Sequence, residues 1–220
     1  PIPRTLQMSL VGLRDLSIIS TAPLNRQNIN TEVIDFNNKK ITTAIESEIS
    51  RDGQLYYVCP RINELKEVED FLKHYLPNIK YQVAHGQMSP KKLKNTMIDF
   101  YNNEFQLLLC TTIVESGLDL QKTNTMIIHN ADKFGLSQLY QLRGRIGRSN
   151  IEAFCYYTVK DLNGISENAY KRLMLLKKFN ARGSSFNLSS HDLDMRGSGN
   201  IIGDAPVSYT HLRAHETLTD

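Results

Sequence analysis

One stretch of the sequence decides the fold, and it reads GQLYYVCPRINELKEVEDFLKHYL over residues 53–76. Residues 55–59 are apolar or aromatic and are bounded by glycine and proline, which predicts a strand. Apolar residues then recur at three-and-four spacing as far as Pro77, with Asn63 as the expected N-cap, which predicts an amphipathic helix. Its expected buried positions are Leu65, Val68, Phe71, Leu72, Tyr75 and Leu76. A strand followed by such a helix is the repeating unit of an α/β fold.

The same unit recurs along the chain. Strands are expected at residues 79–84, 106–111, 125–129 and 153–159, and a short helix between Gly135 and Gly144. Ser89 and Pro90 predict the start of another helix, whose apolar face would hold Leu93, Met97, Phe100 and Tyr101. Near-continuous apolar strands separated by helices predict a parallel sheet covered on both faces.

The two flanks of this series are less regular. On the N-terminal side, residues 13–19 and 29–36 are candidate strands and residues 42–49 a candidate helix. On the C-terminal side, Ser166 is the expected cap of a helix that runs to about Phe179 and buries Leu173 and Leu176. The chain then becomes rich in glycine and serine, which indicates a linker or a functional loop.

Composition names no function. The chain has 220 residues, of which 40% are hydrophobic and 22% charged, and its formal charge of +3 is too small to indicate a nucleic-acid binder. Cys59, Cys110 and Cys155 each lie in an apolar run, so buried reduced thiols are expected, as in the cytoplasm. No run approaches the roughly 18 apolar residues of a membrane span. The chain begins at Pro1 without an initiator methionine, which indicates a fragment.

The most informative motif is QLRGRIGR, residues 141–148. Each helical glycine costs roughly 1 kcal/mol relative to alanine, so this pattern is a poor solvated helix face. Glycines beside arginines let the backbone approach a partner while guanidinium groups reach a multivalent anion, for which triphosphate is the natural candidate. The alternative is an ordinary cluster of surface charge.

A second motif, TTIVESGLD at residues 111–119, directly follows a predicted strand. Ligands of open α/β sheets bind outside the carboxyl ends of the strands. Thr111 and Thr112 can bind phosphate oxygens through hydroxyl and backbone N–H groups, and Asp119 can accept a bond from a ribose hydroxyl. The alternative is a plain turn with a threonine cap.

In this order the two motifs resemble motifs V and VI in the second RecA-like lobe of superfamily 2 helicases and translocases. PIPRTL at residues 1–6, GQLYYVCPRI from Gly53, and HGQM at residues 85–88 extend the resemblance. It indicates the branch that contains RecG and the transcription-repair coupling factors. GLRDLS at residues 12–17 and the run from Ala131 to Ser149 resemble the coupling factors more closely. The similarity runs to about residue 204.

The resemblance assigns roles residue by residue. It implies that Arg145 and Arg148 are the catalytic arginines that reach the ATP γ-phosphate. HDLDMRGSGNIIG at residues 191–203 resembles the translocation motif of this branch, with Arg196 as its working residue and His191 as the orienting partner. Without the family, His191 could simply cap a turn. The remaining implied contacts are Gln141, Gly117 and Asp119 with nucleotide, and Thr111 and Thr112 with the DNA backbone.

The resemblance also predicts a division of the chain. Residues 1–52 would be the end of motif III and a lead-in, residues 53–160 the helicase C-terminal lobe, and residues 161–204 a helical hairpin and the translocation motif. Pro206 stands where the family has the translocation glutamine. Residues 205–220 have no counterpart in the family, which predicts a non-native tail.

The implied activity is ATP-dependent translocation on double-stranded DNA that displaces stalled RNA polymerase and couples transcription to excision repair. The cofactor would be ATP with Mg²⁺, and RNA polymerase and repair proteins would bind through modules absent from this chain. The sequence has no glycine-rich loop ending in Gly-Lys-Ser/Thr and no DExH-type acidic pair. These belong to the first lobe, so the Mg²⁺ ligands are expected there and the chain alone is expected to be inactive. The alternatives are a RecG-like branch-migration helicase, a non-catalytic DNA-binding lobe and a generic nucleotide-binding domain.

Overall fold

The computed structural model describes residues 28–115 and 122–178. The candidate strand at residues 13–19 and the side chain of Phe179 lie outside the described residues. In chain order the elements are β1 (Ile29–Asp35), α2 (Asn38–Ser50), β2 (Gln54–Val58), α3 (Ile62–Tyr75), β3 (Tyr81–Ala84), α4 (Pro90–Tyr101), β4 (Leu107–Cys110), η1 (Thr112–Glu115), β5 (Thr123–Ile128), η2 (Ala131–Lys133), α5 (Leu136–Arg143), β6 (Ala153–Val159) and α6 (Glu167–Lys178).

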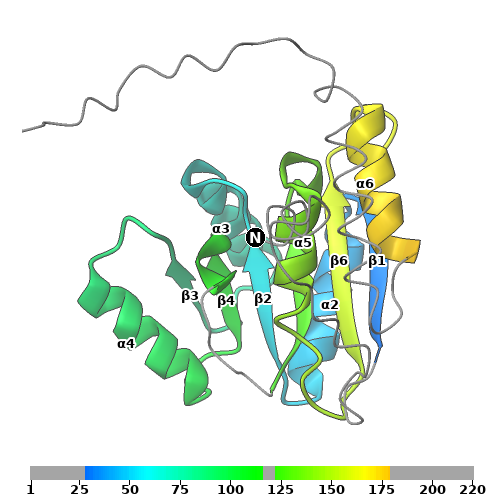
Figure 1. The fold of residues 1–220 in the computed structure, drawn as a ribbon. Coiled ribbons are helices and arrows are strands. Elements are labelled where there is room, and N and C mark those ends of the chain that lie inside the picture. The colour runs from blue at the N-terminus through cyan, green and yellow to red at the C-terminus, as the bar shows by residue number, and fades with distance from the viewer. Residues whose placement is uncertain (1–27, 116–121, 179–220) are drawn as a thin grey trace, which may run out of the picture.

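The strands form one six-stranded sheet in the order β1-β6-β5-β2-β4-β3 (Figure 1). Every described pair of neighbouring strands is parallel. The carboxyl ends of the strands therefore meet at one edge of the sheet, and the loops that follow them lie side by side. The predicted parallel α/β sheet is confirmed.

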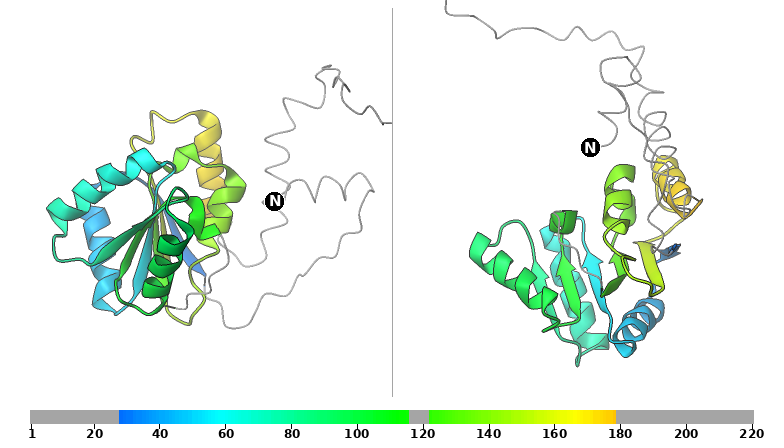
Figure 2. Two further views of the ribbon diagram at one scale, coloured as in Figure 1. Left: turned by 90° about the vertical axis from the view of Figure 1, so that its left-hand side faces the viewer. Right: turned by 60° about the horizontal axis from the view of Figure 1, so that its bottom comes forward.

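Alternate residues of the central strands face opposite sides of the sheet and build two cores. Tyr56 and Val58 of β2 belong to the first core, under α4, α5 and α6. Leu55 and Tyr57 of the same strand belong to the second core, under α2 and α3. Figure 2 shows the helices on both sides of the sheet. Burial on both faces explains why these strands are almost continuously apolar.

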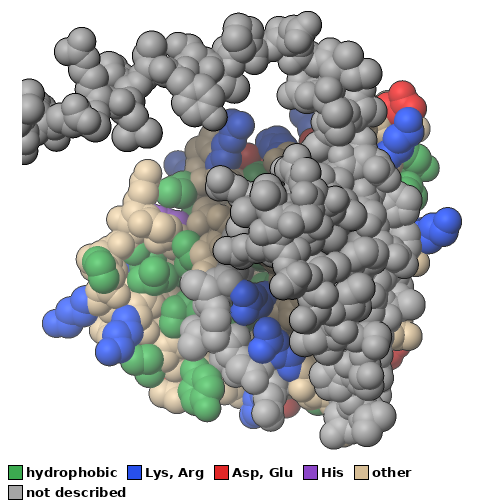
Figure 3. All heavy atoms as spheres, viewed as in Figure 1, with side chains coloured by type: hydrophobic (Ala, Val, Ile, Leu, Met, Phe, Trp, Pro, Cys, Tyr) green, Lys and Arg blue, Asp and Glu red, His purple; other side chains and the backbone are tan. Residues whose placement is uncertain are grey.

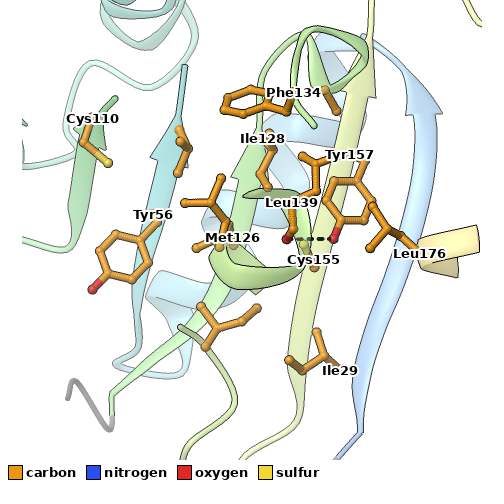
Figure 4. Close-up of a cluster of buried hydrophobic side chains, with 14 of the residues drawn as sticks. Ile29, Tyr56, Cys110, Met126, Ile128, Phe134, Leu139, Cys155, Tyr157 and Leu176 are labelled. Atoms are coloured by element: carbon orange, nitrogen blue, oxygen red, sulfur yellow. Dashed lines mark hydrogen bonds between the residues drawn. The ribbon is translucent and has the colours of Figure 1, made fainter. Parts of the chain in front are cut away.

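The side chains of the first core pack α5 against the sheet. Leu136, Leu139 and Leu142 are fully buried on the inner side of α5. The Tyr157 hydroxyl of β6 also donates a 3.4 Å hydrogen bond to the Leu139 carbonyl oxygen (Figure 4). The chain that follows α5 thus starts from a fixed position.

Two of the predicted helix starts are confirmed and one is wrong. The Ser89 hydroxyl accepts from the N–H of Lys92 and the Ser166 hydroxyl from the N–H of Ala169, as N-caps do. Asn63 is not a cap, because the helix has already begun at Ile62.

Two expected core residues are exposed. Tyr75 at the end of α3 is 46% exposed and Tyr101 at the end of α4 is 65% exposed. Each is the last residue of its helix. Periodicity thus failed at these two positions, although the adjacent residues Leu76 and Phe100 are buried as predicted.

Residues outside the predicted lobe of 53–160 share its sheet. β1 pairs with β6 along seven residues, and α6 contacts β1, α5 and η2. The division of the chain at residues 52, 160 and 204 stays a prediction. All three cysteines are free and buried, as expected. Within residues 28–115 and 122–178, no helix combines the length and apolar character that crossing a membrane requires.

Candidate functional site

The first part of the site lies where β4 ends. Thr111 directly follows β4 and is buried, and Thr112 opens the short helix η1. The Thr111 N–H donates to the Ala84 carbonyl oxygen at 3.2 Å, which continues the pairing of β3 with β4. This backbone donor is therefore already used, and the expectation that it binds phosphate is wrong. The Thr111 hydroxyl and the Thr112 side chain remain candidates.

The second part begins on α5, beside η1. Gln141 is half-buried in the last turn of α5, and the helix ends at Gly144. The N–H of Gly144 donates to the Tyr140 carbonyl oxygen and the N–H of Arg145 to that of Leu142. The helix thus ends between Arg143 and Arg145. QLRGRIGR is therefore a helix end followed by a turn rather than a solvated helix face.

The turn after α5 is anchored so that two arginines stay near the surface. Ile146 is fully buried in the first core, and Gly147 has a φ of +68°. A Cβ atom on Gly147 would lie 3.1 Å from the Ala153 Cβ, so only glycine fits without strain. Arg145 and Arg148 flank this anchor and are half-buried. Figure 3 shows Lys and Arg side chains near the lower end of α5 on this face.

Arg143, the first arginine of the motif, has a structural role instead. It is 5% exposed, and its guanidinium donates a 2.7 Å hydrogen bond to the Leu176 carbonyl oxygen near the end of α6. It also lies 5.2 Å from the ring centroid of Tyr140. A cation satisfies the unpaired carbonyls at a helix C-terminus. Arg143 is thus not available to a phosphate, and only two of the three arginines stay candidates for anion binding.

Tyr56 belongs to the site although the motifs did not single it out. Its ring is 2% exposed, and its hydroxyl lies in the electrostatic field of Arg148, Arg145 and Cys110. Burial raises the pKa of the Tyr56 hydroxyl well above its usual range, while the two arginines act in the opposite direction. The phenol is therefore neutral. The sequence carried no signal for this role, because the side of the sheet that Tyr56 faces is known only from the structure.

Four predicted site residues lie outside the described residues: Gly117, Asp119, His191 and Arg196. Among the residues that the structure does describe, no group of three or more His, Cys, Asp or Glu side chains is placed to hold a metal ion. Arg145, Arg148 and the threonines suit phosphate oxygens, since guanidinium groups bind them in a bidentate manner.

Residues 37–150 match the family model of the helicase conserved C-terminal domain, and they make up more than half of the chain. The chain belongs to this family of helicase domains. The resemblance to superfamily 2 helicases and translocases is confirmed, and so is the RecA-like fold class.

Within this class the chain is similar to transcription-repair-coupling factors. It is 49% identical over 204 residues to that of Rickettsia typhi and 45% identical over 204 residues to that of Myxococcus xanthus. Each match covers 93% of this chain but only 18% and 17% of the relatives, so the chain spans less than a fifth of their length. A solved structure of RecG bound to a three-way DNA junction matches 90% of this chain and 26% of its own, with 32% identity and a TM-score of 0.72.

Proposed function

We propose that this chain is the second motor lobe, with its translocation motif, of an ATP-dependent double-stranded DNA translocase of the transcription-repair coupling type. The observation that carries the proposal is the identity of 45–49% to coupling factors over 93% of the chain. In the proposed role the lobe displaces stalled RNA polymerase and serves excision repair as part of a larger protein. RNA polymerase and the repair proteins would bind to other parts of that protein.

The arginine geometry supports a role in ATP hydrolysis. The Ile146 and Gly147 anchor fixes the backbone between Arg145 and Arg148, so little backbone ordering remains when phosphate binds. On closure of the two lobes, both guanidinium groups would contact the γ-phosphate of ATP, where developing charge needs compensation. An arginine in this position contributes about 10³–10⁵ in rate. Mg²⁺ would neutralise phosphate charge and take its ligands from the first lobe.

The other assignments are part of the same proposal. Gln141, on the turn of α5 that precedes the arginines, would face the nucleotide together with Gly117 and Asp119. Thr111 and Thr112 would contact the DNA backbone at the carboxyl edge of the sheet. Such contacts position the motor without selecting a sequence, so DNA binding should be salt-sensitive and sequence-independent. Arg196 would couple ATP hydrolysis to movement along DNA, and His191 would orient the Arg196 side chain.

The test uses a chimera in which residues 1–204 replace the matching segment of the Rickettsia typhi coupling factor. We expect DNA-stimulated ATP hydrolysis and displacement of a stalled RNA polymerase. Arg145→Ala and Arg148→Ala should each lower ATP turnover at least 100-fold, whereas Lys94→Ala on the exposed side of α4 should leave it unchanged. An active Arg148→Ala chimera would refute the assigned role. The isolated 220-residue chain should hydrolyse no ATP.

A RecG-like branch-migration helicase is the second candidate, favoured by the match to RecG over 90% of the chain. The two candidates share the motor chemistry and differ in the substrate that the motor moves. Inserting the same residues into RecG, and measuring unwinding of a three-way DNA junction, separates them. A chain that drives junction unwinding in RecG but does not displace polymerase in the coupling-factor chimera would support the RecG-like activity.

A further inference from the structure

A cavity lies on the opposite face of the sheet from the arginines. It has a volume of about 540 Å³ and lies between α2 and β6. Tyr156 of β6 packs against the second core, whereas Tyr56 and Ile146 beside the arginines belong to the first. Figure 1 shows α2 behind the sheet and α5 in front of it. The proposed motor function does not use this cavity.

One wall of the cavity is a flat aromatic surface. Phe154 and Tyr156 alternate along β6 and so face the same side of the sheet. Their ring centroids lie 6.4 Å apart and their planes differ by only 10°. The Arg51 guanidinium stands 5.4 Å from the Phe154 centroid. Tyr156 is half-buried, so part of its ring faces the cavity.

The rim of the cavity is basic. Lys39 and Lys40 lie in the first turn of α2, which contains no acidic residue, and Asn37 caps the helix. Cations at a helix N-terminus oppose the macrodipole, so this turn favours a bound anion. Lys40 pairs with Glu32 at 2.7 Å, and both side chains are about half exposed. An exposed pair of this kind contributes little, so Lys40 can change partner at low cost.

A buried ion pair holds the floor of the cavity in shape. The Glu48 carboxylate pairs with Arg51 and accepts a 2.5 Å hydrogen bond from the Thr125 hydroxyl. A Cβ on Gly53 would overlap Glu48 Oε1, so the glycine makes room for this carboxylate. These contacts hold Arg51 beside the aromatic wall. The positive charge of Arg51 is compensated by the Glu48 carboxylate. The cations left for a ligand are Lys39 and Lys40.

We propose that this cavity binds a nucleoside phosphate, with the base stacked on Tyr156 and beside the Arg51 guanidinium and the phosphate at Lys39 and Lys40. The volume lies within the roughly 300–1,000 Å³ typical of small-ligand sites. Aromatic and guanidinium planes stack on any base, so the site should tolerate all four. The nucleoside phosphate is either a free nucleotide or the end of a single strand, which present the same chemistry.

The experiment titrates the 220-residue chain with AMP, adenosine, inorganic phosphate and a 5′-phosphorylated dT hexamer, followed by calorimetry and saturation-transfer NMR. AMP should bind at least fivefold more tightly than adenosine or phosphate alone. Tyr156→Leu should weaken AMP binding at least fivefold, whereas Tyr156→Phe keeps the ring and should stay within twofold. Lys39→Glu should weaken it about tenfold, and Lys94→Glu on α4 serves as the charge-matched control. Circular dichroism of each variant verifies folding.

The two sources are told apart by the hexamer. Binding of the hexamer at least tenfold more tightly than AMP indicates a strand end, and equal binding indicates a free nucleotide. Absence of AMP and hexamer binding, or binding that Tyr156→Leu leaves intact, overturns the proposal. Loss of AMP binding in Arg148→Ala but not in Tyr156→Leu also overturns it, because the nucleotide then sits at the motor site. Tyr156→Leu could also leave ligand binding unchanged but alter the oligomeric state in sedimentation. The cavity would then be an interface between copies of the chain, which overturns the proposal.

Discussion

Gly147→Ala tests the anchor that presents the two arginines. Gly147 has a φ of +68°, and a left-handed conformation costs a non-glycine residue about 1–2 kcal/mol. The added Cβ would lie 3.1 Å from both the Ala153 Cβ and the Ile29 Cγ1. Both neighbours are buried and cannot yield freely, so overpacking adds about 1–2 kcal/mol. The expected loss of unfolding free energy is therefore about 2–4 kcal/mol.

The assay is urea unfolding of the 220-residue chain at 25 °C, followed by circular dichroism. With a urea dependence of about 2 kcal/mol/M, the midpoint should fall by about 1–2 M. Gly86→Ala is the matched control, because an added Cβ there has no neighbour within 4 Å. It should leave the midpoint within about 0.3 M. Equal midpoints for the two variants would refute the reasoning that Gly147 is required by its backbone and its packing.

Two further predictions concern buried ionisable groups. Arg143→Met removes the hydrogen bond to the Leu176 carbonyl oxygen, which should lower the melting temperature by about 4–10 °C in calorimetry, whereas Lys177→Met on the exposed end of α6 should change it by less than about 2 °C. His129 is 5% exposed, and burial holds its pKa below 6.5. The folded chain takes up this proton less readily than the unfolded chain, so stability should decline as the pH falls through 6.5, and His129→Phe should flatten this decline in urea titrations. An unchanged slope would show that another group causes it.

Much of the fold could be predicted from the sequence because a strand buried on both faces is apolar at almost every position. Residues 153–159 were predicted with their observed bounds, since β6 reads AFCYYTV, a run of aromatic, small apolar and β-branched residues between polar turns. Helix burial was predicted less well at Tyr101, the last residue of α4, which is 65% exposed although the adjacent Phe100 is fully buried against Tyr56 of β2. The strand order depends on contacts between distant segments, which local periodicity does not record.

The sequence predicted which motif carries the candidate site but not which residues of that motif are available to bind an anion. Motif spacing identified Arg145 and Arg148, yet Arg143 stands in the same motif and is buried. Its partner, the Leu176 carbonyl oxygen, lies on a helix 33 residues further along the chain. Tyr56 escaped notice because an aromatic residue in a strand is usually core. In each case a partner distant in sequence decides the role, and local pattern cannot identify it.

The pairing of β1 with β6 has a practical consequence for excising this lobe. The family match covers residues 37–150, which leaves both strands and α6 outside. A fragment cut at those limits would lose Ile29 and Ala153, the two side chains against which Gly147 packs. It would also turn β5 into an open edge, with Met126 and Ile127 newly accessible to other chains. The smallest unit that keeps the arginines in place begins before Ile29 and extends through α6.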